Sequence, residues 1–205
     1  MVRRDGLKFA QFRDFSYDAV ETGAPPKQTI AMDLKELEIR RLKHSDAPAI
    51  FEAVQESVSD VSTWMDWCHA DYSLEDAQEW IGITNEGFKD STQYDFGIFG
   101  ANRYLGQVGV NRINHQARYA NLGYWVRTSA TGRGVAPVAV RLLTDWAFAN
   151  TDLQRLEIVV ALGNERSLRV AEKTGAVREG ILRSKVRVLD RFYDAVIYSI
   201  VRGDL

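Results

Sequence analysis

A glycine-rich segment between a candidate strand and a candidate helix is the clearest chemical feature of this sequence. It reads Thr131-Gly132-Arg133-Gly134-Val135-Ala136. Glycines let a backbone approach a ligand closely, and the N–H groups and dipole at a helix N-terminus favour an anion. Arg133 adds a positive charge within the loop. The segment predicts a phosphate-binding loop, and an ordinary strand-to-helix connection is the alternative.

Two well-known phosphate motifs do not describe this loop. No Gly-Lys-Ser/Thr follows the glycines, so the segment is not a Walker loop. Pro137 stands where a dinucleotide fingerprint has its third glycine.

Thiol and metal chemistry find little support. Cys68 is the single cysteine, which excludes an internal disulfide and a cysteine-based zinc site. The histidines at 44, 69 and 115 have no metal-ligand spacing. We therefore expect no metal site, and we interpret Cys68 as a small, partly buried residue rather than an acyl-relay thiol.

Hydrophobic periodicity places the loop in an α/β domain. Residues 1–36 lack a clear period and predict an N-terminal extension, followed by one domain over 37–205. The expected order is β-α-α-β-β-β-α-β-α-β-β, a mixed sheet with helices on its faces. The expected strands are 37–42, 93–99, 104–113, 119–126, 156–160, 176–188 and 192–201, and the expected helices begin near Ser45, Ser73, Gly134 and Asn164. Ser45 and Asn164 are expected to cap their helices, and Gly175 is expected to end the last helix in a left-handed conformation.

Composition narrows the class of protein. The 205 residues are 45% hydrophobic and 26% charged, with a net charge of −2, which argues against a general nucleic-acid binder. No uncharged apolar run approaches the length of a membrane span. The single cysteine suits a reducing compartment, so we expect a soluble, cytoplasmic protein.

Several ordered motifs carry a family resemblance. Leu122-Gly123-Tyr124-Trp125-Val126 precedes the glycine loop, and Asn164-Glu165-Arg166-Ser167 follows the next strand. Trp64-Met65-Asp66-Trp67 stands upstream, before Ser73-Leu74-Glu75-Asp76. Over about residues 37–203 the chain resembles the GNAT acetyltransferase superfamily, within its RimJ/RimL-like branch of ribosomal-protein-type N-terminal acetyltransferases. The resemblance implies a GNAT-like, mostly antiparallel sheet with helices on both faces.

The resemblance also implies acetyl-CoA as co-substrate, with direct attack of an amine on the thioester. Thr131 departs from the Gln or Arg usual at the first position of the loop, but the important donors there are backbone N–H groups. The residues implied to bind the cofactor are Trp125, Val126, Arg127, Thr131, Gly132, Arg133, Gly134, Val135, Ala136, Asn164 and Arg169.

Ser167 matches the hydroxyl that reaches the departing sulfur in this branch, which would make it the general acid. The alternative is a serine that satisfies backbone groups at the start of a helix. The superfamily's usual tyrosine falls at Ala171.

The general base is left open. The branch often has Glu at the position of Asn121, and some members have one near Val186, but neither residue is acidic here. A water held by Glu157 or Asp66 is one possibility, and an amine that arrives already neutral is the other.

The acceptor side carries acids and tryptophans. Residues 45–95 contain twelve acidic residues and one lysine, a local net charge of −11, so the rest of the chain carries +9. Either the acids attract a cationic acceptor or they form a solvated face. We assign Trp64, Asp66 and Trp67 to acceptor binding.

The sequence therefore predicts an acetyl-CoA-dependent N-acetyltransferase that acts on a protein N-terminal α-amine or a small cationic amine, and a homodimer is one expected assembly. The alternatives are a polyamine- or aminoglycoside-type acetyltransferase and a non-catalytic CoA-binding or interaction module on the same fold.

Overall fold

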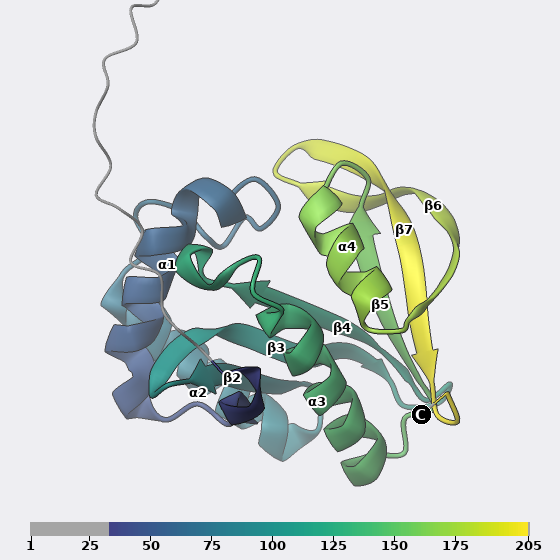
Figure 1. The fold of residues 1–205 in the computed structure, drawn as a ribbon, viewed down its shortest axis with the longest axis horizontal. Helices are drawn as coiled ribbons and strands as arrows, with labels where there is room; N and C mark the ends of the chain where they lie inside the picture. The colour runs from purple at the N-terminus through teal and green to yellow at the C-terminus, as the bar shows by residue number, and fades with distance from the viewer. Residues whose placement is uncertain (1–32, 205) are drawn as a thin grey trace, which may run out of the picture.

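A computed structural model of the chain describes residues 33–204 (Figure 1). Most of the predicted extension over 1–36 lies outside the described residues. From residue 37 on, the helices and strands follow one another in the predicted order. Their bounds are β1 Glu38–Arg40, α1 Ala47–Val61, α2 Leu74–Asp90, β2 Tyr94–Gly100, β3 Arg103–Asn114, β4 Tyr119–Val126, α3 Val135–Asn150, β5 Arg155–Ala161, α4 Glu165–Lys173, β6 Val177–Val188 and β7 Arg191–Val201, with short 3₁₀ helices η1 Leu34–Glu36, η2 His44–Asp46 and η3 Thr128–Ala130.

The strands form one seven-stranded sheet in the order β1-β2-β3-β4-β5-β7-β6. Neighbouring strands are antiparallel except β4 and β5, which are parallel. Successive residues of a strand point to opposite faces of the sheet, so both faces can pack against helices, and helices cover both. On β3, Val108 packs in the cluster with α3, whereas the neighbouring Gln107 accepts a hydrogen bond from Trp80 of α2. The predicted fold class is confirmed.

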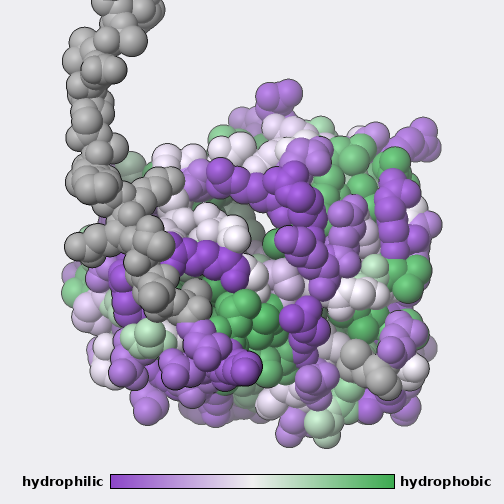
Figure 2. Space-filling model, viewed as in Figure 1, coloured by the Kyte–Doolittle hydropathy of each residue, from purple (hydrophilic) through white to green (hydrophobic). Residues whose placement is uncertain are grey.

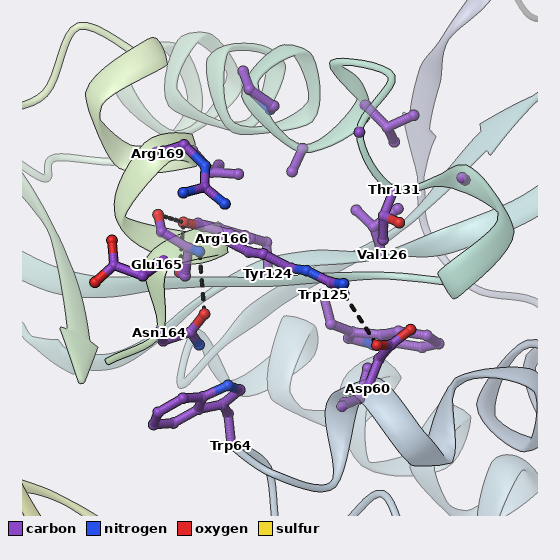
Figure 3. Close-up of a pocket in the computed structure, with 18 of the residues that line it drawn as sticks. Asp60, Trp64, Tyr124, Trp125, Val126, Thr131, Asn164, Glu165, Arg166 and Arg169 are labelled. Atoms are coloured by element: carbon purple, nitrogen blue, oxygen red, sulfur yellow. Dashed lines mark hydrogen bonds and ion pairs between the residues drawn. The ribbon is translucent and has the colours of Figure 1, made fainter. Parts of the chain in front are cut away.

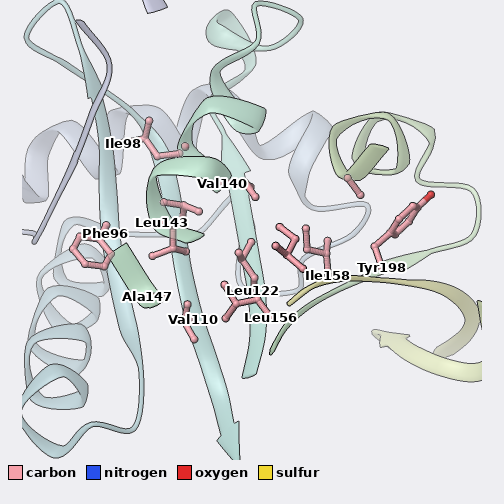
Figure 4. Close-up of a cluster of buried hydrophobic side chains, with 14 of the residues drawn as sticks. Phe96, Ile98, Val110, Leu122, Val140, Leu143, Ala147, Leu156, Ile158 and Tyr198 are labelled. Atoms are coloured by element: carbon pink, nitrogen blue, oxygen red, sulfur yellow. The ribbon is translucent and has the colours of Figure 1, made fainter. Parts of the chain in front are cut away.

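The larger core lies between α3 and the sheet (Figure 4). Val140, Leu143 and Ala147 recur at helical spacing on one face of α3, and all three are fully buried. They pack on alternate residues of β2, β3 and β4. A second cluster lies under α1 and α2, on the other side of the sheet. The glycine loop therefore joins a strand and a helix that are both anchored in the larger core.

Helix caps show where local sequence was sufficient. The α2 helix begins at Ser73 as predicted, and Ser73 caps it: its hydroxyl accepts from the Asp76 N–H, and Asp76 accepts from the Ser73 N–H. The predicted cap at Ser45 is wrong. Ser45 lies inside η2, and the Asp46 carboxylate instead accepts from the Lys43 N–H and from Arg40. An ion pair to β1 thus fixes the start of α1.

The parallel pair β4 and β5 separates along its length. Their ladder consists of three Cα pairs and ends where Asn121 faces Glu157. Beyond that point β4 continues to Val126 along β3, while β5 continues to Ala161 along β7. The two strands therefore diverge, and the edge of β4 that faces β5 is left open to a ligand.

Candidate active site

A cleft opens where β4 and β5 diverge. Its volume is about 800 Å³, which is ample for a nucleotide-sized ligand. Tyr124, Trp125 and Val126 of β4 contribute to its lining. Further lining comes from the glycine loop with the first turn of α3, from the α4 helix, and from the end of α1 with the segment that follows it. Figure 2 shows the hollow near the centre of this face, framed by hydrophilic side chains, and Figure 3 shows the side chains around it.

The glycine loop has the backbone geometry that an anion site requires. Gly132 and Gly134 have φ values of 76° and 83°, in the left-handed region that favours glycine. No side chain caps the N-terminus of α3, and its first turn carries no acidic residue. The N–H groups at this helix end, which lines the cleft, therefore remain available to a negatively charged ligand.

The α1 helix holds the segment that leads into this loop. Glu56 accepts from the Ser129 N–H at 2.6 Å, and the Ser57 hydroxyl accepts from the Thr128 N–H at 3.1 Å. The Thr128 hydroxyl donates to Asp60 at 2.7 Å. These contacts fix η3 against α1, and η3 in turn fixes the start of the glycine loop.

Arg127 belongs to this same attachment and not to the cleft. Its side chain is 3% exposed, and it donates to Glu52, Glu56 and the Tyr104 carbonyl oxygen. Its backbone N–H donates to Leu105. Burial opposes ionisation of Glu56, but the hydrogen bonds from Arg127 and Ser129 outweigh it and hold the pKa of that carboxyl below its ordinary value. The side chain of Arg127, which was predicted to bind the cofactor, is thus engaged by α1 and lies outside the cleft lining.

At the start of α4, two of the predicted residues hold each other in place. Asn164 is the N-cap, and its side-chain oxygen accepts from the Ser167 N–H at 3.1 Å. The Ser167 hydroxyl oxygen lies 3.0 Å from the hydroxyl oxygen of Tyr124 on β4. Ser167 is thus both part of the helix start and a hydroxyl that lines the cleft.

The α4 wall of the cleft is cationic. Arg166, Arg169 and Lys173 line it, spaced at three and four residues so that they share one side of the helix. Arg166 forms an ion pair with Asp60 at 3.1 Å, which joins α4 to α1 (Figure 3). Among the described residues that line the cleft, the carboxylates are Asp60 and Glu165. The lining therefore has a surplus of positive charge.

The tryptophan-rich segment after α1 contributes to the cleft only in part. Trp64 lines it and packs edge-to-face on Tyr193, with ring centroids 5.7 Å apart. Trp67 instead packs on Trp125 at 5.4 Å and is 39% exposed. Asp66 accepts from the Leu189 N–H in the β6–β7 turn at 3.2 Å. Trp67 and Asp66 therefore support the site from outside the cleft.

The structure sorts the predicted site residues into two groups. Those that line the cleft are Trp125, Val126, Thr131, Gly132, Gly134, Val135, Ala136, Asn164, Arg169, Ser167 and Trp64. Those that do not are Arg127, Arg133, Asp66 and Trp67. Cys68 is almost fully buried in the smaller core, and this burial raises the pKa of its thiol, which argues against an acyl relay.

Neither of the residues considered for holding a basic water lines the cleft. Glu157 accepts from Arg155 at 2.8 Å, and its register partner Asn121 donates to Asn111. Asp66 is occupied by the β6–β7 turn. Within residues 33–204, no cluster of three histidine, cysteine or acidic residues could hold a metal ion. In that same part of the chain, no helix is both long and apolar enough to cross a membrane.

Two parts of the site were missed by sequence reasoning. Tyr124 was placed on its strand without a role, although alternation with Trp125 indicates that it faces the opposite side of the sheet. The spacing of Glu52, Glu56 and Asp60 at four-residue intervals predicts one helix face, but nothing local indicates that their partners lie about 70 residues away.

Comparison with known proteins identifies the family. Residues 36–177 match the model of the acetyltransferase (GNAT) domain. YdaF of Bacillus subtilis, provisionally named a ribosomal N-acetyltransferase, is 26% identical over 167 residues, covering 81% of this chain and 91% of that protein. The ribosomal-protein-serine acetyltransferase of Escherichia coli is 29% identical over 104 residues, covering 51% of this chain and 58% of that protein.

A solved structure shows the same fold. The ribosomal L7/L12 α-N-protein acetyltransferase RimL, crystallised with coenzyme A, superposes with a TM-score of 0.76 at 21% identity, covering 83% of this chain and 96% of that one. The chain belongs to the GNAT acetyltransferase family, and it is an acetyl-CoA-dependent N-acetyltransferase.

Proposed function

We propose that this enzyme acetylates the N-terminal α-amine of a polypeptide. The observation that carries the proposal is the charge of the cleft. Its described lining has two carboxylates, of which Asp60 is bonded to Thr128 and Arg166, while Arg166, Arg169 and Lys173 add positive charge. Among the described residues, the lining therefore offers no cluster of carboxylates that would suit a polycation.

The ionisation of the acceptor decides between amine classes. An α-amine has a pKa of about 7.7–8.0, so roughly a quarter of it is neutral near pH 7.4. A lysine-type primary amine, with a pKa of about 10.4, is only ~0.1% neutral at that pH. A cleft without a dedicated base therefore favours the α-amine by about two orders of magnitude. The relationship to ribosomal-protein acetyltransferases supports the same acceptor class.

Each part of the cleft has a role in this proposal. The N–H groups of the glycine loop bind the pyrophosphate, and Arg169 and Lys173 supply nearby positive charge. The open edge of β4 accepts the extended pantetheine arm. Backbone groups near Trp125 and Val126 polarise the thioester carbonyl, and the Ser167 hydroxyl donates to the leaving sulfur. The thioester supplies an activated acetyl group, and the neutral amine attacks it directly.

The acids of the neighbouring helices have a different role from the one considered from sequence. Glu52, Glu56 and Asp60 hold η3, and Asp76 caps α2. Their negative charge is therefore balanced within the fold, and we do not assign them to attraction of a cationic acceptor. Location in the cytoplasm, a homodimer and a separate extension over 1–36 remain expectations from the sequence.

A panel of amines tests the proposal. The purified chain is incubated with acetyl-CoA and, separately, a peptide with a free α-amine and an internal lysine, the same peptide with its α-amine blocked, and spermidine. Thiol release and mass spectrometry report transfer. We expect acetylation of the free α-amine alone. Exclusive modification of lysine or spermidine would contradict the acceptor assignment, and CoA binding without transfer to any amine would favour the binding-module alternative.

A further inference from the structure

Two hydroxyl groups meet inside the cleft, one from β4 and one from α4. The Tyr124 hydroxyl oxygen lies 3.0 Å from the Ser167 hydroxyl oxygen and 3.1 Å from the Ser167 carbonyl oxygen. Both residues line the cleft, and Tyr124 packs against the larger core. Figure 3 shows Tyr124 reaching from the sheet to the first turn of α4. The pair thus spans the gap between the diverging strands.

The number of hydrogens limits how this pair can bond. Tyr124 has one hydroxyl hydrogen and two acceptors within reach, the carbonyl and the hydroxyl oxygen of Ser167. When Tyr124 donates to the carbonyl, the 3.0 Å contact can form only if the Ser167 hydroxyl donates to Tyr124. When Tyr124 donates to the Ser167 hydroxyl, the serine hydrogen is free to point elsewhere. The direction of one hydrogen bond therefore decides where the serine can donate.

We propose that Tyr124 is a positioning residue that donates to the Ser167 hydroxyl and so directs the serine hydrogen into the cleft, toward the sulfur of CoA. This inference rests on the proposed role of Ser167 and extends it. The Asn164 side chain, which accepts from the Ser167 N–H, holds the backbone while Tyr124 sets the hydroxyl. The serine is then a hydrogen-bond donor whose orientation is fixed from two sides.

The ionisation of Tyr124 restricts its role to hydrogen bonding. Burial raises the pKa of Tyr124 to about 12, although its hydrogen bond with Ser167 acts in the opposite direction. A thiol has a pKa of about 8.5, more than three units below that of this tyrosine. Transfer of a proton from Tyr124 to a thiolate is therefore unfavourable. Tyr124 therefore keeps its proton. The pair stabilises negative charge on the leaving sulfur by donation, and no tyrosinate forms.

The proposal is tested on the thiol of bound CoA, without an acceptor and without turnover. The thiol is titrated by its thiolate ultraviolet absorbance in the protein saturated with CoA. The same titration with desulfo-CoA subtracts the signals of Cys68 and the tyrosines. The proteins compared are the wild type, Tyr124→Phe, Ser167→Ala and the double variant. Tyr198→Phe is the matched control, because Tyr198 is a buried tyrosine of the same core cluster, on β7.

A hydrogen bond to a thiolate favours its formation, so the wild type should show a low titration midpoint. We expect Tyr124→Phe and Ser167→Ala each to raise the midpoint, the former by about 0.5–1 pH unit. Adding Tyr124→Phe to Ser167→Ala should give no further rise, because the tyrosine acts through the serine. Tyr198→Phe should leave the midpoint unchanged. Thermal unfolding checks that each variant is folded.

Three results would overturn the inference. An unchanged midpoint in Tyr124→Phe means that the tyrosine only packs. A tyrosine effect that persists in the Ser167→Ala background means that it does not act through the serine. An unchanged midpoint in Ser167→Ala removes the role of both hydroxyls. None of these depends on the acceptor, so failure of the α-amine assignment in the peptide panel remains distinguishable.

Discussion

The two walls of the cleft carry charge in opposite ways. The α1 helix is rich in acids, but Glu52 and Glu56 lie outside the lining of the cleft and are bonded to the buried Arg127. The α4 wall is rich in cations, and Arg169 and Lys173 line the cleft directly. The local charge of −11 over residues 45–95 therefore does not describe what a ligand meets. Acids bonded within the fold act on stability, whereas cations that line a cleft act on binding.

The largest effect is expected at the loop that the two walls enclose. A valine at Gly134 would be strained at a φ of 83°, and its Cβ would come within 3.1 Å of Leu34. We expect Gly134→Val to weaken CoA binding at least 100-fold, measured by calorimetry, while circular dichroism shows a folded protein. Gly175→Ala is the control, because Gly175 has a similar φ of 84° just beyond the C-terminal end of α4. Unchanged CoA affinity in Gly134→Val would contradict the phosphate-loop assignment.

The second prediction concerns the α1 wall. Arg127→Met leaves Glu56 without its buried partner and releases η3. We expect a loss of about 2–4 kcal/mol in the free energy of unfolding, measured with denaturant. The control is Arg103→Met, because Arg103 contacts Glu52 at 3.8 Å from a more exposed position. This substitution should lower the free energy of unfolding by under ~1 kcal/mol. Equal losses in the free energy of unfolding of the two variants would show that the burial of Arg127 against Glu56 is unimportant.

The third prediction contrasts Glu56 and Asp95, two acidic residues of the segment 45–95. Hydrogen bonds hold the pKa of Glu56 below its ordinary value, whereas burial outweighs a hydrogen bond from Gln107 and raises the pKa of Asp95 to about 6. The folded state therefore favours protonated Asp95, and stability falls as the pH rises from about 4 through 6. Asp95→Asn should raise the free energy of unfolding at pH 7 by about 1–3 kcal/mol and have little effect below about pH 4. Denaturant unfolding of both proteins across this pH range checks the prediction. A gain in the free energy of unfolding that does not change with pH would refute the titration argument.

The smallest effect is expected on the α4 wall, where an exposed cation faces the cleft. Arg169→Gln should weaken CoA binding about 5–10-fold, the range expected for one exposed charge–phosphate contact, with no change in stability. The loss should shrink as salt screens the interaction. Arg183→Gln on β6 provides a matched control outside the cleft lining. If both variants bind CoA like the wild type, the cations of α4 are only a solvated surface.

The difference between the walls also explains what the sequence could predict. The order of elements, the cap at Ser73 and the left-handed glycine at 175 depend on periodicity and on neighbours within a few residues, and the structure confirms them. The contacts of Arg127 and the cap of α1 depend on partners elsewhere in the fold, and local pattern did not predict them. Arg127 bonds to an acid 75 residues away. The spacing of acidic residues indicates which face of a helix is acidic. It does not indicate which cationic side chain will form an ion pair with that face.

Tyr124 shows a further limit of the same kind. The motif around it predicted a strand but no role for its side chain. Its contact with Ser167 spans 43 residues and depends on the divergence of β4 from β5. That divergence follows from the ladder ending at Asn121, a feature of the sheet register that no single segment encodes.

The central claim is that the cleft acts on an amine that arrives neutral, without a carboxylate base of its own. The most direct measurement is the pH dependence of kcat/KM for two peptides whose α-amines differ in pKa. The account predicts that the rise in kcat/KM follows each peptide's own amine, so that the two midpoints differ as the amine pKa values do. A single midpoint shared by both peptides, set by a group on the enzyme, would contradict it.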